Sequence, residues 1–292
     1  MRRAFSLRCA ALLAGALFLV PVLARADDES NLDLDHINLK YNGGPLMEHV
    51  RVATLFWGPS WRQDQKQRQL SDYMNGFFQD LFADGRFMAN LAQYSAGGYT
   101  IGNGEFIATD TDEKQPPARV KDGQIHAEIR AQVAAGNLPK PDANTLYVVF
   151  TPPNVVIELE GGESGKDFLG YHSYAVAFLE DEFAYAVIPY SDKHEIEPGN
   201  PRLMTDTVSH ELAEAVTDPR VSFSELGWYD EHNGEIADIV DYLYYDHRIG
   251  PHDLWDVLEG TAGRRYLVQK QWSNRDGKPV AFAPVGQTTA AR

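Results

Sequence analysis

The chain has 292 residues, of which 26 are Lys or Arg and 42 are Asp or Glu, so its formal net charge is −16. Hydrophobic residues make up 43% and charged residues 23%, which is the balance of a globular protein rather than a disordered one. Nucleic-acid binding needs a basic surface, and anionic membrane surfaces attract basic segments. We therefore expect no nucleic-acid partner and no binding to an anionic membrane surface.

The first 26 residues have the pattern of a secretory signal peptide. Arg2, Arg3 and Arg8 precede an apolar run from Cys9 to Leu23, and Ala24-Arg25-Ala26 fits an A-x-A cleavage site. Cleavage removes four of the basic residues and no acidic one, leaving 22 basic against 42 acidic residues and a net charge of −20. We expect an exported protein, periplasmic or secreted, with no membrane insertion after signal cleavage.

Cys9, inside the predicted signal peptide, is the single cysteine of the chain. The mature protein would therefore have no thiol, which excludes disulfides, cysteine-ligated zinc and a cysteine nucleophile. Any metal site must be built from the nine histidines and the many Asp and Glu residues.

Strand and helix patterns alternate along the rest of the chain. Residues 27–48 are polar and punctuated by Gly and Pro, which indicates an extended N-terminal arm. The elements predicted in chain order are a strand over 49–57, a helix over 70–82 behind a capping box of Ser60 and Gln63, a strand over 99–108, an acidic loop over 109–117, a short helix capped by Asp122, a central strand over 146–150, a surface loop over 158–168, a strand over 184–189, a helix over 201–218 and a strand near 266–272. No long linker or internal repeat follows, so 49–292 is predicted to be a single catalytic-like domain of the α/β (α+β) class, with a mixed sheet and packed helices.

The helix predicted over 201–218 carries the residues of greatest chemical interest. His210 and Glu214 are four residues apart and share a helix face, and Glu211 points one residue further round. The rest of the helix is mostly apolar, so it should be largely buried, where an imidazole and two carboxylates are costly unless they are paired or hold a metal. The H-E-x-x-E pattern follows the logic of H-E-x-x-H metallopeptidases: His210 and Glu214 bind the ion, and Glu211 takes a proton from the ion-bound water. A solvated acidic helix face is the alternative.

A third ligand is expected downstream of this helix. Glu235 follows Glu214 by 21 residues, a distance comparable to that of the glutamate ligand in peptidases of the thermolysin type. Glu235 and Asp238 are three residues apart, so a short helix capped by Asn233 would aim both at one site. We predict Glu235 as the third ligand and Asp238 as the hydrogen-bond acceptor that fixes the tautomer of His210. The weaker ligand candidates are Asp218 and His232.

This donor set predicts one divalent metal ion and a zincin-like domain. Zinc is favoured, but one histidine with several carboxylates is more anionic than a two-histidine site and should make bound water less acidic, so calcium and manganese are alternatives. The ion would polarise a scissile carbonyl, and His172 or Tyr229 would help to stabilise the oxyanion. A hydrogen-bonded structural histidine is the other interpretation of His172.

Several segments, in order over 41–274, together resemble the EXORDIUM/phosphate-induced protein family of plant cell walls, which has bacterial relatives. These segments are YNGGPL (41–46), LFWG (55–58), GYHS (170–173), SHELAEAVTDP (209–219), GEIAD (234–238) and QKQWSN (269–274). The resemblance implies an exported protein of shared fold, and it does not by itself imply catalysis. Plant members carry paired cysteines and many lack the His-Glu pair, so His210, Glu211 and Glu214 suggest that bacterial-type members keep a metallopeptidase-like site.

Two functions of different classes follow from these patterns. The first is an exported metal-dependent hydrolase, best matched by a zincin-like metallopeptidase acting on an extracellular or periplasmic protein or peptide. The second is a non-catalytic secreted or cell-wall-associated binding protein of the EXORDIUM type, whose partner is a cell-wall polymer and whose metal is structural. Paired carboxylates for glycoside hydrolysis also fit the composition, but no spacing singles out a pair.

Overall fold

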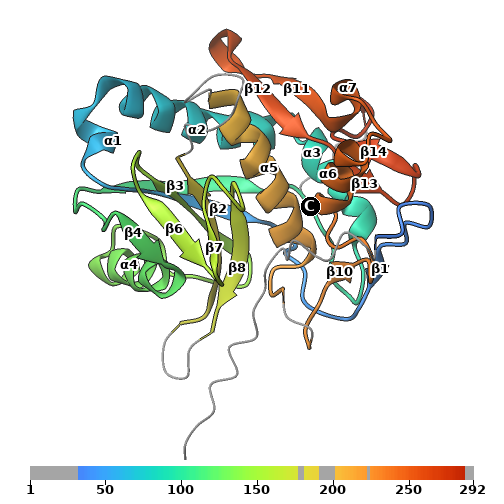
Figure 1. The fold of residues 1–292 in the computed structure, drawn as a ribbon, viewed down its shortest axis with the longest axis horizontal. Coiled ribbons are helices and arrows are strands. Elements are labelled where there is room, and N and C mark those ends of the chain that lie inside the picture. The colour runs from blue at the N-terminus through green and yellow to red at the C-terminus, as the bar shows by residue number, and fades with distance from the viewer. Residues whose placement is uncertain (1–31, 177–180, 191–200, 222–223, 287–292) are drawn as a thin grey trace, which may run out of the picture.

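A five-stranded mixed sheet forms the centre of the computed structural model, which describes residues 32–176, 181–190, 201–221 and 224–286 (Figure 1). In sheet order its strands are β3 (Glu105–Asp112), β2 (Arg51–Trp57), β5 (Thr145–Thr151), β9 (Phe183–Pro189) and β8 (Tyr171–Ala175). The first four are parallel, and β8 runs antiparallel to β9 at one edge. The predicted α/β class with a mixed sheet is confirmed; the predicted signal peptide lies outside the described residues.

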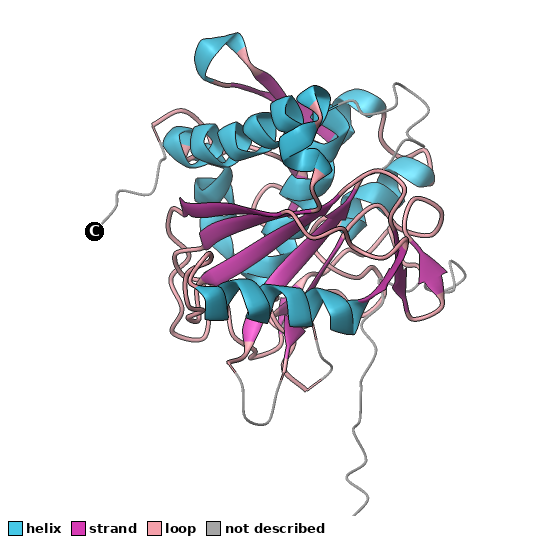
Figure 2. Cartoon of the chain, turned by 90° about the vertical axis from the view of Figure 1, so that its left-hand side faces the viewer, coloured by secondary structure: helices cyan, strands magenta, loops and turns pink. Residues whose placement is uncertain are grey.

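Helices cover both faces of this sheet (Figure 2). The helices are α1 (Ser60–Gln63), α2 (Gln65–Asp84), α3 (Arg86–Leu91), α4 (Asp122–Ala135), α5 (Pro201–Thr217), α6 (Asp238–Tyr245) and α7 (Pro251–Leu254), with short 3-10 helices η2 (Ala92–Tyr94) and η3 (Thr261–Gly263). α4 packs on one face, and α2 and α5 pack on the other. In the described part of the chain, no helix combines the length and the apolarity needed to cross a bilayer.

The central strands send alternate side chains into two separate cores, as the period of two in a strand requires. On β5, Leu146 and Val148 belong to the core beneath α2 and α5, whereas Tyr147 belongs to the core beneath α4. The same alternation acts on β8, where Tyr171 packs in the α4 core while the next residue, His172, lies against α5. Neighbouring residues of one edge strand therefore serve opposite faces of the sheet.

Smaller sheets surround this centre. They are β4 (Arg119–Lys121) with β6 (Val156–Leu159) and β7 (Gly162–Glu163), β1 (Lys40–Tyr41) with β10 (Trp228–Tyr229), β11 (Trp255–Glu259) with β12 (Arg265–Gln269), and β13 (Gln271–Ser273) with β14 (Lys278–Val280). The surface loop predicted over 158–168 is partly wrong, because β7 folds back on the end of β6 there. β1, within the predicted N-terminal arm, pairs antiparallel with β10.

The predicted helices over 70–82 and 201–218 are confirmed as α2 and α5, and the predicted strands over 146–150 and 184–189 as β5 and β9. The strand predicted over 99–108 is displaced, because β3 begins at Glu105 and its pairing with β2 continues to Asp112. It thus includes the first part of the predicted acidic loop over 109–117.

The caps predicted for α2 and α4 are wrong. Asp64, rather than Ser60, caps the long helix α2, and its carboxylate accepts hydrogen bonds from two backbone amides of the first turn at 2.8 and 3.0 Å. Asp122 is the first residue of α4 rather than its cap. Its carboxylate instead accepts hydrogen bonds from the hydroxyls of Tyr171 and Tyr185, so a tertiary contact replaces the local one.

Candidate metal centre

α5 carries His210, Glu211 and Glu214 into the space between the sheet edge and α6. Ala, Leu and Glu favour a helix through 211–215, and the helix stops at Thr217 because Pro219 disfavours helical backbone before it. His210 Nε2 lies 3.2 Å from Glu214 Oε1, so the two residues share one helix face. The carboxylates of Glu211 and Glu214 are both buried.

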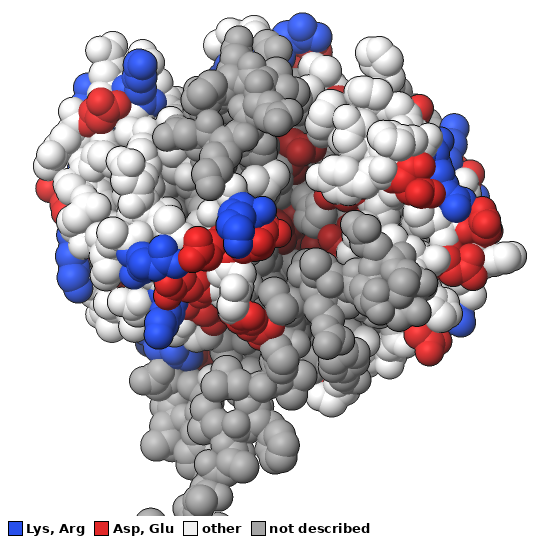
Figure 3. Space-filling view, in the orientation of Figure 1, with Lys and Arg blue, Asp and Glu red and all other residues white. Residues whose placement is uncertain are grey.

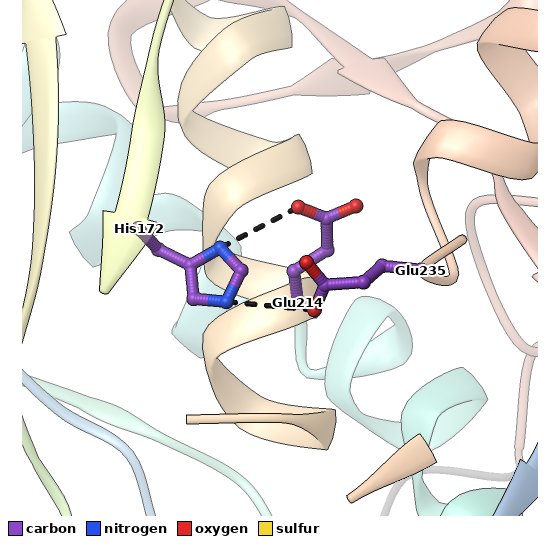
Figure 4. A group of neighbouring side chains, drawn as sticks. All are labelled: His172, Glu214 and Glu235. Carbon is purple, nitrogen blue, oxygen red and sulfur yellow. Dashed lines mark ion pairs between the residues drawn. The ribbon is translucent and has the colours of Figure 1, made fainter. Parts of the chain in front are cut away.

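His172 reaches the same space from β8 (Figure 4). Its Nδ1 lies 3.4 Å from Glu211 Oε2 and 3.5 Å from Glu214 Oε2. Its Nε2 lies 3.5 Å from Oε1 of Glu235, which belongs to the segment just before α6. Three segments distant in the chain thus converge on one imidazole.

Among the residues that the structure describes, two groups of three could hold a metal ion. His172, Glu214 and Glu235 each offer a ligand atom within 4.8 Å of the others, and so do His210, Glu211 and Glu214. Glu214 belongs to both groups. The predicted ligands His210, Glu214 and Glu235 are therefore brought together but divided between two groups, and His172 stands among the ligand candidates.

Asp238 lies beside His210, although the local structure differs from the prediction. α6 begins at Asp238, so Glu235 precedes the helix instead of sitting in its first turn, and the Asn233 side chain donates to the N-terminal arm instead of capping α6. Asp238 Oδ1 lies 3.4 Å from His210 Nε2, and the Asp238 backbone N–H donates to Glu214 Oε1 at 3.3 Å. The backbone at the start of α6 thereby orients the shared carboxylate.

Gln269 of β12 determines the tautomer of His210. Its Nε2 donates to the carbonyl of Ala237 at 3.1 Å and to Asp241 Oδ1 at 3.0 Å, so its Oε1 faces His210 Nδ1 at 3.0 Å. The proton is held on Nδ1, and Nε2 faces Glu214 and Asp238. Asp238 was predicted to have this role, and neither Gln269 nor Asp241 was predicted as a site residue.

The carboxylates of Asp218 and Glu235 each have one buried oxygen without a hydrogen bond from the described residues. The Asp218 carbonyl lies 3.2 Å from His172 Nε2, and Asp218 Oδ1 accepts from the Gly227 N–H at 2.9 Å. Among the described residues, Asp218 Oδ2 and Glu235 Oε1 have no hydrogen-bond partner. Such orphaned oxygens are costly unless a cation or a proton compensates them.

Gly170 makes room for the site on the β8 side. A Cβ at this position would lie 2.6 Å from Thr207 Cγ2 and 2.9 Å from Glu211 Oε1, closer than real contacts allow. A glycine immediately before the buried pair of Tyr171 and His172 therefore lets α5 approach the edge strand closely.

The pKa values show an excess of buried carboxylates. Burial raises the pKa of three carboxyls, those of Glu211, Glu235 and Asp238. It also raises the pKa of Asp218 to about 7 and the pKa of Asp241 to about 8. At Glu214 burial acts in the same direction, but the charge of His210 and the hydrogen bond from His172 outweigh it and lower the pKa to about 2. Burial lowers the pKa of both imidazoles, yet the surrounding carboxylates raise it well above the ordinary value. Without a metal, the carboxylates therefore favour the charged form of both imidazoles.

The solvent exposure of the side chains in the site increases from His172 on β8 to Asp241 on α6. The side chains of His172 and Glu214 are 3% and 4% exposed, whereas Asp238 and Asp241 are 16% and 30% exposed. Figure 3 shows a hollow bordered by acidic side chains over the region where α5 and α6 lie in Figure 1. The solvent therefore reaches the site from the α6 side.

Four predicted candidates lie outside these groups: Asp218 and Asp238, which contact the two histidines, and Tyr229 and His232. Tyr229 is half-buried on β10, opposite Lys40 of β1, and His232 is exposed in the turn that follows. Neither belongs to the groups that could hold a metal. Comparisons with protein-family models, curated proteins and solved structures return no match to this chain, so the site is defined by its own geometry.

Proposed function

We propose that this protein is an exported metal-dependent hydrolase, a metallopeptidase in which α5 supplies both metal ligands and the general base. The observation that carries the proposal is the pairing of His210 with Glu214 at 3.2 Å on a buried helix face, with Glu211 within ligand distance of both. A divalent cation held there supplies Lewis-acid polarisation of a scissile carbonyl and makes water a better nucleophile at neutral pH.

The residues present fit such a cation. Imidazole nitrogens with carboxylate oxygens suit zinc, and the carboxylate-rich composition also suits manganese or calcium. Glu235 Oε1 and Asp218 Oδ2 support the same proposal, because neither oxygen accepts a hydrogen bond among the described residues.

Glu211 has the environment of a general base. Burial raises the pKa of its carboxyl, which brings it closer to the operating pH, where proton transfer is most efficient. His172 Nδ1 lies 3.4 Å from Glu211 Oε2, and Gly170, which has no side chain, leaves room for Glu211 Oε1. The chain thus orients this group before a substrate binds.

The test compares Glu211→Gln with a control, Glu128→Gln. Glu128 is also a buried glutamate, but it belongs to α4, on the other face of the sheet. With zinc-loaded mature protein and an unfolded casein substrate, Glu211→Gln should retain the metal and lose about 10²–10⁴-fold in rate. Glu128→Gln should retain both. Cleavage by Glu211→Gln at the parent rate would contradict the proposal.

A second function is favoured by one observation, the burial of His172 and Glu214. In this alternative, a structural metal stabilises a non-catalytic secreted protein of the EXORDIUM type, which binds a cell-wall polymer. Removal of the metal would then lower the melting temperature, while casein would remain intact in the presence of the loaded protein. Co-sedimentation with insoluble cell-wall polysaccharide would support this alternative.

A further inference from the structure

We infer that the cluster is a dinuclear centre, with two divalent metal ions bridged by the carboxylate of Glu214. This inference rests on the proposed function in taking the cluster as a metal centre, and it changes the number of ions and the role of His172. The two candidate groups share Glu214, and its two oxygens face different histidines. Oε2 lies 3.5 Å from His172 Nδ1, and Oε1 lies 3.2 Å from His210 Nε2.

Both imidazoles are oriented as metal ligands usually are. A ligating histidine commonly donates its other N–H to a carbonyl or carboxylate, which fixes the tautomer. His172 directs Nε2 to the carbonyl of Asp218 at 3.2 Å, and His210 directs Nδ1 to Gln269 Oε1 at 3.0 Å. The nitrogens left over are the two that face Glu214.

Each position has further carboxylate donors of its own. On the His172 side, Glu235 belongs to the same candidate group, and its Oε1, 3.5 Å from His172 Nε2, has no hydrogen-bond partner among the described residues. On the His210 side, Asp238 Oδ1 lies 3.4 Å from His210 Nε2. Glu211 lies close to both positions, since it belongs to the group of His210 and also lies 3.4 Å from His172 Nδ1.

The charge of the cluster also suits two cations. The carboxylates of the two candidate groups and Asp238 carry four negative charges when ionised, which two divalent ions neutralise with both histidines neutral, and Asp218 and Asp241 are further carboxylates beside them. A single divalent ion would leave two uncompensated charges among buried groups, where each is expensive. In known two-metal sites the paired ions stabilise both the attacking and the leaving oxygen, so the arrangement is compatible with hydrolysis.

The experiment counts ions in the mature full-length chain. Metal-free protein is loaded with Mn²⁺ alone, freed of excess ion and measured by elemental analysis. We expect two ions per chain in the parent, one in His172→Ala, one in His210→Ala, and two in His126→Ala, which changes a histidine on the other face of the sheet. Glutamine variants of His172 and His210, checked by near-UV circular dichroism, replace any alanine variant that does not fold.

Electron paramagnetic resonance provides the second readout. Two Mn²⁺ ions sharing a carboxylate should show exchange coupling in the parent and in His126→Ala, and an uncoupled signal in either single-site variant. One ion per chain in the parent, and none in His210→Ala, would overturn the dinuclear inference and leave the proposed function standing. Absence of any bound ion in the parent would overturn both.

Discussion

Two histidine–carboxylate clusters lie on opposite faces of the same sheet, one partly exposed beside α4 and one buried beside α5, and their polar atoms are satisfied in different ways. On the α4 face, Asp122 Oδ1 accepts hydrogen bonds from Tyr171 and Tyr185, each at 2.7 Å, and its Oδ2 lies 3.1 Å from His126 Nε2. On the α5 face, His172 is surrounded by carboxylates that cannot donate hydrogen bonds to one another when ionised. Adjacent residues of β8, Tyr171 and His172, belong to the two clusters.

The pKa values of the two clusters differ in direction. Burial raises the pKa of Asp122, but His126 and the two tyrosine hydroxyls outweigh burial, and the pKa falls below its ordinary value. Burial and neighbouring acids raise the pKa of Glu235 well above its ordinary value, despite His172. Protein donors alone therefore satisfy the first cluster, whereas the second has the donor atoms and the charge of a cation site.

The largest effect should come from Glu214→Gln. In metal-free protein this change leaves two imidazoles without their shared counter-charge, which should cost about 3–5 kcal/mol of unfolding free energy. It should also abolish metal binding. Urea unfolding and elemental analysis measure the two losses, with Glu128→Gln as the control. A metal content equal to that of the parent would show that Glu214 is not a shared ligand.

Next in size is Gln269→Leu, which removes the acceptor from His210 Nδ1. The imidazole then no longer has a fixed tautomer, and metal affinity should fall about 10–100-fold, the range for groups that orient a ligand. A competition titration with a chromogenic chelator measures the affinity. Unchanged affinity would mean that Asp238 or Asp241 orients His210 without Gln269.

Asp122→Asn should lower the stability through the α4-face cluster without changing metal binding at the α5-face cluster. It removes the charge that accepts two tyrosine hydroxyls and faces His126, so it should cost about 1–3 kcal/mol of stability. Because the substitution lies on the α4 face, the number of bound metal ions should equal that of the parent. Loss of metal from this variant would show that β8 couples the clusters mechanically.

The pH dependence of stability should have opposite signs in the two clusters of metal-free protein. The pKa of Asp241 is about 8 against an ordinary 3.8, so its contribution is complete below pH 4 and disappears as the pH rises through 8. The lowered pKa of Asp122 gives a contribution that is present above pH 4 and lost in stronger acid. Urea midpoints at pH 5 and 8, with chelator present, should therefore differ less in Asp241→Asn than in the parent. Equal differences would contradict this assignment.

The sequence alone predicted several helices and strands and some of the residues of the candidate metal centre. Hydrophobic periodicity identified α2, a continuous apolar run identified β5, and the i, i+4 spacing placed His210 with Glu214. Spacing could not show that an antiparallel edge strand would deliver His172 to α5, because that depends on tertiary pairing. Gln269 was out of reach for the same reason, since nothing in a strand sequence marks the histidine that a polar side chain will contact. Asp241 had a local signal, three residues after Asp238 on the same helix.

Crystals of the mature protein soaked in MnCl₂ and measured near the manganese edge test the central claim most directly. The two clusters then serve as site and control within one molecule. Anomalous density beside Glu214, between His172 and His210, with none beside Asp122, is the expected result. An empty α5 cluster at saturating Mn²⁺, or equal density at the two clusters, would contradict the account.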